Sequence, residues 1–290
     1  MKFPERLESR IEACGNPVCL GMDPKLSLMP VERKHPTVKT AEDKIRFFYE
    51  DILSECAKRN VFPAVVKPNS AYYECVSIEC MKVLHDLILD YREAGVPAIL
   101  DAKRGDIGKS SAAYAEAAFK IYGADAVTVS PWMGKDSVEP FLNSSEDRGV
   151  YVLLRTSNKG AADFQDMTVE GKPAFFHVAQ KLLDWDNGNT GAVVGATHPE
   201  ELERITAFFA EAGHEIPFLI PGVSIPGVPG GQGGDAKTVL AAIANGGGKR
   251  RFHVLNSSSG LNFAWQRTGN EADYASACVD ALESLADSLR

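Results

Sequence analysis

The chain has 290 residues, of which 31 are Lys or Arg and 39 are Asp or Glu, so its formal net charge is −8. This length suits one large domain or two small ones with ample core, and the acidic balance argues against nucleic acid or an anionic membrane as a partner. The sequence has no apolar run of about 18 residues and no apolar segment after Met1, so we expect neither a membrane span nor a secretory signal.

The six cysteines and six histidines show no C-x-x-C or H-E-x-x-H spacing, and they do not combine at the spacing of a zinc site. We therefore expect buried, reduced thiols in a cytoplasmic protein, and we expect no metal site.

Short apolar runs alternate with helical stretches along the whole chain. The runs predict strands at residues 17–23, 64–67, 96–101, 126–129, 150–154, 191–194, 217–220 and 252–255. The intervening segments predict helices at 40–57, 73–94, 110–122, 173–185, 199–212 and 271–289, and further helices that begin at 136 and 235. Thr40 is the predicted N-cap of the first helix, with Asp43 at the spacing of a capping box.

Eight strands, each followed by a helix, predict an α/β fold of the (β/α)8 or TIM-barrel type. The predicted strands are continuously apolar, as a parallel sheet covered on both faces requires. No linker or low-complexity segment divides the chain, so we expect a single domain over residues 1–290. An open, doubly wound sheet is the alternative arrangement.

The third predicted strand leads into a charged stretch, residues 101–107 (DAKRGDI). Asp101 and Lys103 lie two residues apart on a strand and should therefore project from the same face. Gly105 breaks the strand, and Asp106 precedes the next helix. Folding gains little from such crowding, since each buried charge costs several kcal/mol to desolvate. The alternative to a functional cluster is a strand-end ion pair that caps the helix through Asp106.

Polar side chains gather at the carboxyl ends of the predicted strands, whereas the opposite ends are mostly Pro, Gly, Ala and Val. Barrels of this kind carry their function at the carboxyl ends. The polar residues found there are Asp23, Lys67, Asp101, Lys103, Thr128, Ser130, Thr156, Ser157, Thr197 and the run 256–259. This asymmetry favours a functional cluster over a structural ion pair.

The charges of Asp23, Lys67, Asp101, Lys103 and Asp106 are expected to alternate at this end of the barrel. Flanking carboxylates keep an amine protonated, so Lys103 is expected to be a poor nucleophile and a well-placed acid. Asp101 would repel a substrate carboxylate, and loss of that carboxylate as carbon dioxide would leave a carbanion for Lys103 to stabilise and protonate. We give stabilisation by Lys103 more weight than repulsion. The pattern predicts decarboxylation without a cofactor.

A Gly-rich segment, residues 221–235, joins the seventh strand to its helix. Loops after strands seven and eight form the usual phosphate site of barrels, and glycines free backbone N–H groups to face an anion. We therefore expect this segment to close over a phosphate group. A loop with no ligand is the alternative.

Two other glycine motifs are excluded by their context. Residues 231–236 (GQGGDA) fit a dinucleotide pattern, but the next strand ends at Leu255 and Asn256 without the acidic residue that such a site needs. Residues 108–110 (GKS) resemble the end of a P-loop, whose first glycine would fall on Lys103.

Taken together, these residues resemble the orotidine 5′-phosphate decarboxylase family, and its longer bacterial (type 2) subfamily in particular. The most specific piece is 101–108 (DAKRGDIG), and the supporting pieces are 21–24 (GMDP), 67–69 (KPN), 155–158 (RTSN), 194–197 (VGAT), 221–223 (PGV) and 232–235 (QGGD). The resemblance runs along nearly the whole chain. It implies a barrel homodimer that converts orotidine 5′-phosphate to uridine 5′-phosphate and carbon dioxide without a cofactor, in pyrimidine biosynthesis.

The resemblance also implies roles for individual residues. Lys103 would be the proton donor, Asp101 would face the departing carboxylate, and Asp106 and Ser110 would reach the neighbouring subunit's site. Lys67 would join the charge chain and, like Asp23, contact the ribose. The remaining expected substrate contacts are Thr156 and Ser157 for the pyrimidine, and Gln232, Gly233, Ser258 and Ser259 around the phosphate. Ser259 stands where the family carries a phosphate-binding arginine, and Arg267, Arg250 or the local backbone are the candidate substitutes.

Two rival functions fit parts of the same pattern. One is a related barrel that acts on a sugar phosphate through a metal-bound enediolate, for which D-x-K-x-x-D would serve. The other is a nucleotide-binding barrel without catalytic activity, for which the missing arginine is the motive. The hydroxyl-rich Thr156–Ser157 pair suits a pyrimidine edge better than the substrate of the first rival, and the complete charged cluster argues against the second.

Overall fold

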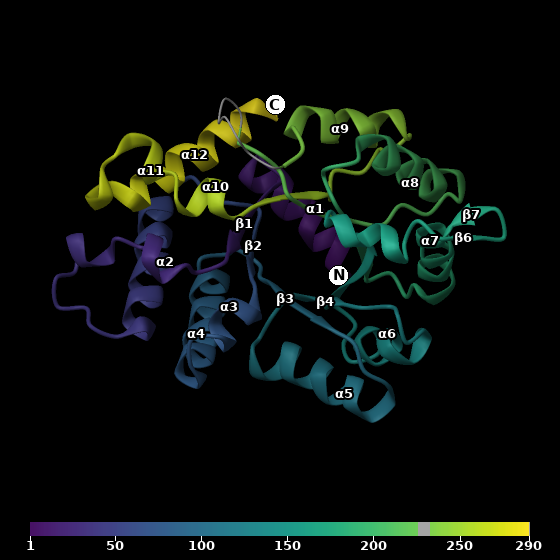
Figure 1. The fold of residues 1–290 in the computed structure, drawn as a ribbon, viewed down its shortest axis with the longest axis horizontal. Helices are drawn as coiled ribbons and strands as arrows, with labels where there is room; N and C mark the ends of the chain where they lie inside the picture. Colours follow the sequence, from purple (N-terminus) through teal and green to yellow (C-terminus); the bar gives the residue numbers. More distant parts are fainter. Residues whose placement is uncertain (226–232, 290) are drawn as a thin grey trace.

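A computed structural model of the protein describes residues 1–225 and 233–289. Eight parallel strands form one sheet that curls into a barrel within a ring of helices (Figure 1). The order around the sheet is β2 (Val65–Pro68), β1 (Val18–Met22), β10 (Val254–Ser257), β9 (Phe218–Pro221), β8 (Thr190–Val194), β5 (Gly149–Arg155), β4 (Ala126–Val129) and β3 (Ile99–Arg104). Bridges between Val66 and Ala98 and between Asn69 and Asp101 join the two end strands. The predicted (β/α)8 barrel is confirmed.

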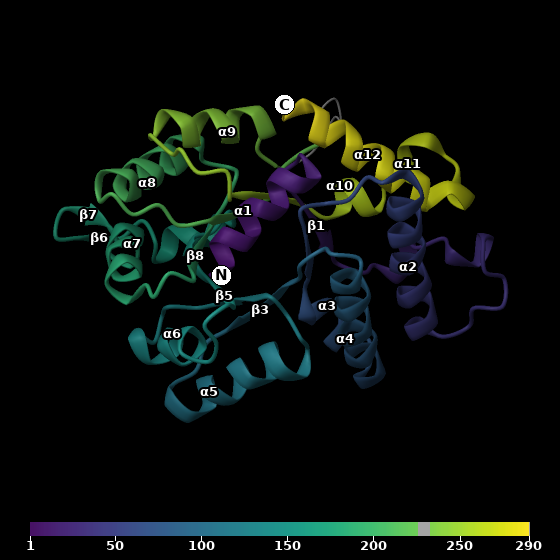
Figure 2. The same cartoon turned by 180° about the vertical axis from the view of Figure 1, so that it is seen from behind.

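Helices cover the outer face of the sheet and surround it in both views (Figures 1 and 2). They are α2 (Ala41–Arg59), α3 (Ser70–Glu74), α4 (Ile78–Glu93), α5 (Gly108–Glu116), α6 (Lys135–Leu142), α7 (Ala174–Trp185), α8 (Pro199–Glu211), α9 (Ala236–Asn245), α10 (Ser259–Asn262), α11 (Trp265–Thr268) and α12 (Tyr274–Ser288). Thr40 caps α2 as predicted, since its side chain accepts a hydrogen bond from Asp43 N. Apolar side chains between sheet and helices form the larger core.

The barrel interior is a second apolar cluster, to which every strand contributes. Its strand residues are Cys19, Val65, Ile99, Ala126, Tyr151, Val193, Leu219 and Val254. Three residues of the N-terminal helix α1 (Phe3–Cys14) complete it, namely Phe3, Leu7 and Ile11. Such layered packing fills a barrel of this size with side chains and leaves no pore.

Helix α1 lies across one end of the barrel, as Figure 2 shows from that side. The sequence predictions did not include it, although Phe3, Leu7 and Ile11 repeat every four residues and Lys2 and Glu5 form a capping box. The Phe3 ring packs so closely on β5 that a Cβ atom at Gly149 would lie 2.3 Å from it. Because α1 blocks this end, a ligand must enter from the opposite end.

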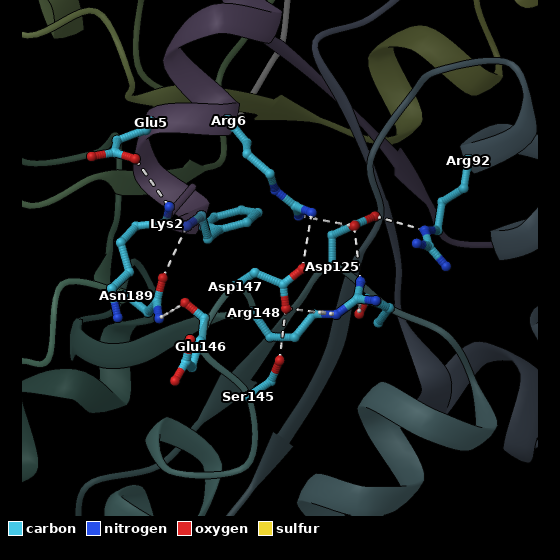
Figure 3. Close-up of polar contacts among 12 residues, drawn as sticks. Lys2, Glu5, Arg6, Arg92, Asp125, Ser145, Glu146, Asp147, Arg148 and Asn189 are labelled. Carbon is cyan, nitrogen blue, oxygen red and sulfur yellow. Dashed lines mark hydrogen bonds and ion pairs between the residues drawn. The ribbon is translucent and has the colours of Figure 1, made fainter.

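Asp125, just before β4, gathers three arginines at the end of the barrel near α1 (Figure 3). Its carboxylate lies 3.0 Å from Arg6, 3.1 Å from Arg92 and 3.0 Å from Arg148. It also accepts a hydrogen bond from the backbone of Ala98, at 3.1 Å. This network around the buried Asp125 ties α1 and α4 to the segments that lead into β3, β4 and β5.

Several predicted elements differ in detail. The helix expected at 73–94 is broken into α3 and α4, because Ser77 turns the chain and caps α4 by accepting from Cys80 N. A hairpin, β6 (Thr168–Val169) with β7 (Lys172–Pro173), and the short helices α10 and α11 were not predicted.

The predicted burial of the cysteines holds for four of the six, whereas Cys75 is exposed and Cys14 is half-buried. Among the described residues, no helix is both long and apolar enough to cross a membrane.

Candidate active site

Asp101 on β3 lies between two lysines at the open end of the barrel. Its Oδ2 atom accepts a hydrogen bond from Lys67 Nζ at 2.7 Å, and its Oδ1 atom accepts one from Lys103 Nζ at 2.6 Å. The side chains of Lys67 and Asp101 are only 5% and 7% exposed, whereas that of Lys103 is 48% exposed. The triad therefore has a buried base and one ammonium group that reaches accessible space.

An irregularity in β3 places Lys103. The pairing of β3 with β4 shifts between Leu100 and Arg104, and Lys103 has a left-handed backbone with φ +45°. A non-glycine residue in this region is strained and persists only where its surroundings hold it. Here Thr128 holds it, because its hydroxyl accepts from Lys103 N and donates to Asp101 Oδ1, both at 2.9 Å. The prediction that Asp101 and Lys103 share a face is confirmed by their contact.

Burial and charge act in opposite directions on this triad. Burial alone would raise the pKa of Asp101, but the charges and hydrogen bonds of Lys67 and Lys103 outweigh it and hold that pKa well below its usual value. Burial alone would lower the pKa of Lys67, but the carboxylates of Asp101 and Asp23 hold it above its ordinary range. The buried carboxylate and ammonium are therefore both charged at neutral pH.

The triad opens into a cavity of about 400 Å³. Lys67, Asp101, Lys103 and Thr128 line it on one side, and the remaining lining residues are Leu153, Thr156, Ser157, Asn158, Val193, Leu219 and Pro221. Thus the structure brings the predicted residues Thr156 and Ser157 into the same cavity as the triad. Gly195 lets the backbone at the end of β8 lie close to Ser157, since a Cβ atom at residue 195 would lie 2.8 Å from the Ser157 side chain.

Asp23 follows β1 beside the triad. It makes no hydrogen bond with Lys67, but its charge contributes to the raised pKa of that lysine. Its Oδ1 atom is buried and has no hydrogen-bond partner among the described residues. A buried carboxylate oxygen without a partner is an acceptor available to a ligand hydroxyl.

A second cavity of about 290 Å³ adjoins the first, and both involve the end of β9. It is lined by Gly222, Val223, Ser224, Ile225, Gly233, Asn256, Ser257, Ser258, Ser259 and Gly260. The predicted residues Gly233, Ser258 and Ser259 therefore lie together, whereas Gln232 lies outside the described residues. None of the described lining residues is Lys or Arg, and the sequence 226–232 contains neither.

The arginines expected as substitutes do not line this second cavity. The expectation that Arg250 could bind the phosphate is wrong, because Arg250 lies at the opposite end of the barrel and pairs with Glu8 of α1 at 2.7 Å. Arg267 donates from Nη1 to the carbonyl oxygen of Gly260 at 3.1 Å, so its guanidinium is bound by the main chain. Within the described part of the chain, the local backbone and the serine hydroxyls are the donors that remain.

Asp106 and Ser110 lie away from the triad's cavity within one chain. Asp106 is half-buried, and its Oδ1 atom accepts a hydrogen bond from Ile107 N at 2.7 Å. Ser110 is exposed on the first turn of α5. The alternative in which Asp106 caps the helix is wrong, since Ile107 is the N-cap of α5 and no side chain caps it.

Sequence reasoning assigned no role to the residues that hold the loop after β5, although Arg155 opens the 155–158 piece. Arg155 is buried and pairs with Glu201 of α8 at 2.6 Å, and Gln165 binds both the main chain and the side chain of Thr156. A charged residue at the end of an apolar strand was a usable signal for Arg155, but nothing in the local sequence marks Gln165.

Among the described residues, no three His, Cys, Asp or Glu side chains form a cluster suited to a metal ion.

The fold and the site together define a class: a (β/α)8 barrel with a lysine–aspartate–lysine triad and two joined cavities at its open end. Comparison with known proteins identifies the family within this class. Residues 16–250 match the model of the orotidine 5′-phosphate decarboxylase / HUMPS family, and the chain belongs to that family.

Relatives of known name agree with this placement. The chain is 40% identical over 268 residues to the orotidine 5′-phosphate decarboxylase of Janthinobacterium sp. (strain Marseille), covering 91% of this chain and 90% of the relative. It superposes on the structure of Leishmania donovani OMP decarboxylase with a TM-score of 0.73 at 31% identity, covering 99% of each chain. It also superposes on Leishmania donovani UMP synthase with a TM-score of 0.75 at 33% identity, and there it spans 56% of the longer chain.

Proposed function

We propose that this protein decarboxylates orotidine 5′-phosphate to uridine 5′-phosphate and carbon dioxide in pyrimidine biosynthesis, without a cofactor. The observation that carries the proposal is the Lys67–Asp101–Lys103 triad, whose exposed ammonium group lines the cavity. The named relatives and the family match support the same reaction.

In the proposed reaction, the bond between the pyrimidine ring and its carboxylate carbon breaks, and its electron pair stays on the ring carbon. The Lys103 ammonium stabilises this developing charge and then transfers a proton to the carbon. Asp101 keeps Lys103 in place, and its negative charge disfavours a second carboxylate close by. Thr128 supports this arrangement, because it fixes both the backbone of Lys103 and the carboxylate of Asp101.

The rest of the ligand would extend along the two cavities. We assign the pyrimidine edge to Thr156 and Ser157, and ribose hydroxyls to Lys67 and the unpaired oxygen of Asp23. The phosphate would occupy the second cavity, among Gly233, Ser258 and Ser259. The described ends of the 221–235 loop are held together beside this cavity, since Gly234 N donates to Gly222 O and Ser224 N donates to Gly234 O.

We further propose a homodimer in which Asp106 and Ser110 complete the neighbouring site. Large apolar side chains are exposed next to Asp106 in the sequence and on the loop that precedes α6, a helix packed against α5. Ile107 is 55% exposed, Trp132 76% and Met133 51%. An exposed apolar patch beside a functional residue is typical of a protein–protein interface.

We also propose a cytoplasmic location, with which the six free cysteines agree.

The decisive experiment is an assay of the purified, chelator-treated protein with orotidine 5′-phosphate and no added cofactor. The proposal requires release of uridine 5′-phosphate and carbon dioxide at an undiminished rate. Activity that needs magnesium would instead favour the enediolate barrel. Tight binding of uridine 5′-phosphate without turnover would favour a binding protein.

A further inference from the structure

A buried guanidinium anchors the loop that follows β5. Arg155 donates from Nε and Nη2 to the two carboxylate oxygens of Glu201, at 2.6 and 3.1 Å, and its Nη1 lies 3.1 Å from Asp166. The pairing of β5 with β8 shifts between Leu153 and Arg155. Leu153 therefore lines the cavity, whereas Arg155 turns outward to α8. None of these contacts takes part in the proposed proton transfer.

Gln165 connects this anchor to the cavity. Its Oε1 atom accepts from Thr156 N at 2.9 Å, and its Nε2 atom donates to Thr156 Oγ1 at 2.8 Å. The orientation of the amide is forced, because a backbone N–H only donates and must therefore face the oxygen. The nitrogen is then left to face the hydroxyl.

The fixed amide of Gln165 determines the direction of the next hydrogen bond. Since Thr156 Oγ1 accepts from Gln165, its own hydrogen is free and is donated to Asn158 Oδ1 at 2.7 Å. This hydrogen bond uses one lone pair of the Asn158 oxygen and turns that oxygen toward Thr156. The N–H groups of the Asn158 amide make no hydrogen bond with the described residues, and Asn158 lines the cavity beside Ser157, so these donors are what its side chain offers to a ligand.

We propose that Gln165 is a positioning residue that determines which pyrimidine base the cavity accepts. By holding Thr156 and Asn158 in one hydrogen-bond direction, it presents a donor that suits a ring carbonyl and disfavours an exocyclic amine. This inference rests on the proposed function, because it places a pyrimidine nucleotide in the cavity. It adds a selection of carbonyl-bearing bases over amino-bearing bases.

The test compares uridine 5′-phosphate with cytidine 5′-phosphate, which differ at this ring edge by a carbonyl against an amine. Dissociation constants are measured by calorimetry for the parent protein, Gln165→Glu and Thr156→Val. A glutamate at 165 can still accept from Thr156 N, but it also takes the hydroxyl hydrogen, which frees the amide of Asn158 to turn. We expect the preference for the uridine nucleotide to fall by about tenfold in both variants, which corresponds to about one hydrogen bond.

A matched control is Gln180→Glu on α7, since among the described residues the amide of Gln180 bonds with the exposed Asp184 alone. It should keep the parent preference. If Gln165→Glu weakens both nucleotides equally, or leaves the ratio unchanged, the selective role is wrong and Gln165 is only structural. Turnover of orotidine 5′-phosphate by the parent protein is measured in parallel, so that failure of the proposed function is seen separately.

Discussion

Lys103 Nζ lies 2.6 Å from Asp101 Oδ1, and the backbone of Lys103 itself is left-handed, with φ +45°. A regular strand would carry both side chains on one face, whereas here the pairing of β3 with β4 is irregular and Lys103 has a left-handed backbone. Thr128 fixes this geometry, because it bonds to the backbone N–H of Lys103 and to the carboxylate of Asp101. One ammonium is thus held at the cavity by a buried carboxylate, and the first two predictions concern this pair.

Replacing Lys103 by alanine should remove the proton donor without removing the ligand contacts. We expect kcat to fall by about 10²–10⁴-fold, because a positioned general acid typically contributes this much. Binding of uridine 5′-phosphate, measured by calorimetry, should change far less. A Lys103→Ala protein with near-parent kcat would contradict the assigned role.

Replacing Asp101 by asparagine should destabilise the fold by about 3–5 kcal/mol, because it leaves Lys67 charged and buried without its partner. The pKa of Asp101 lies below its unfolded value of about 3.9, so its contribution is complete above that pH and is lost as the pH falls toward the folded value. Urea unfolding at pH 7 and pH 3 checks this. The stability gap between the parent protein and Asp101→Asn should narrow at the lower pH, and a constant gap would count against the pair.

Replacing Ser259 by arginine should strengthen phosphate binding. The second cavity offers only neutral donors among its described residues, and a charge-assisted hydrogen bond is about twice as strong as a neutral one. We expect KM for orotidine 5′-phosphate to fall by about tenfold and to become more sensitive to salt. The control is uridine without phosphate, whose affinity should not change. An increase in KM would mean that the phosphate binds elsewhere.

Replacing Asp125 by asparagine should reduce stability without changing the chemistry. The loss leaves three arginines without their shared carboxylate, and because their side chains are 18–32% exposed the cost should fall below the about 3–5 kcal/mol of a fully buried pair. Because this network lies at the end of the barrel closed by α1, KM at a temperature well below the melting point should stay at the parent value. Thermal melts and kinetics on one preparation test both halves.

Replacing Trp132 by aspartate should separate the proposed dimer. Trp132 is 76% exposed in the single chain, and its ring lies 5.2 Å from that of Phe164. A charge at the centre of an apolar interface opposes association. Analytical ultracentrifugation should show a monomer, and activity should fall with it, because Asp106 and Ser110 would no longer complete the neighbouring site. Full activity in a monomer would overturn that arrangement.

The continuous apolar runs and the polar residues after them were sufficient to predict the barrel, the end at which these polar residues gather, and the common face of Asp101 and Lys103. These features depend on local pattern and on the two-residue repeat of a strand, which the sequence contains directly. The pattern Phe3, Leu7 and Ile11 also carried a helix signal that the predictions did not use.

Other features depend on which distant segments meet, and only the tertiary structure decides that. Thr128 fixes the kink at Lys103 from a neighbouring strand, and Gln165 reaches back to Thr156 from a loop with no regular repeat. Arg250 illustrates the same limit, since its charge suited a phosphate but the fold places it at the opposite end, against Glu8. A charge acts over a few ångströms, so its role is set by the packing that brings its partners together.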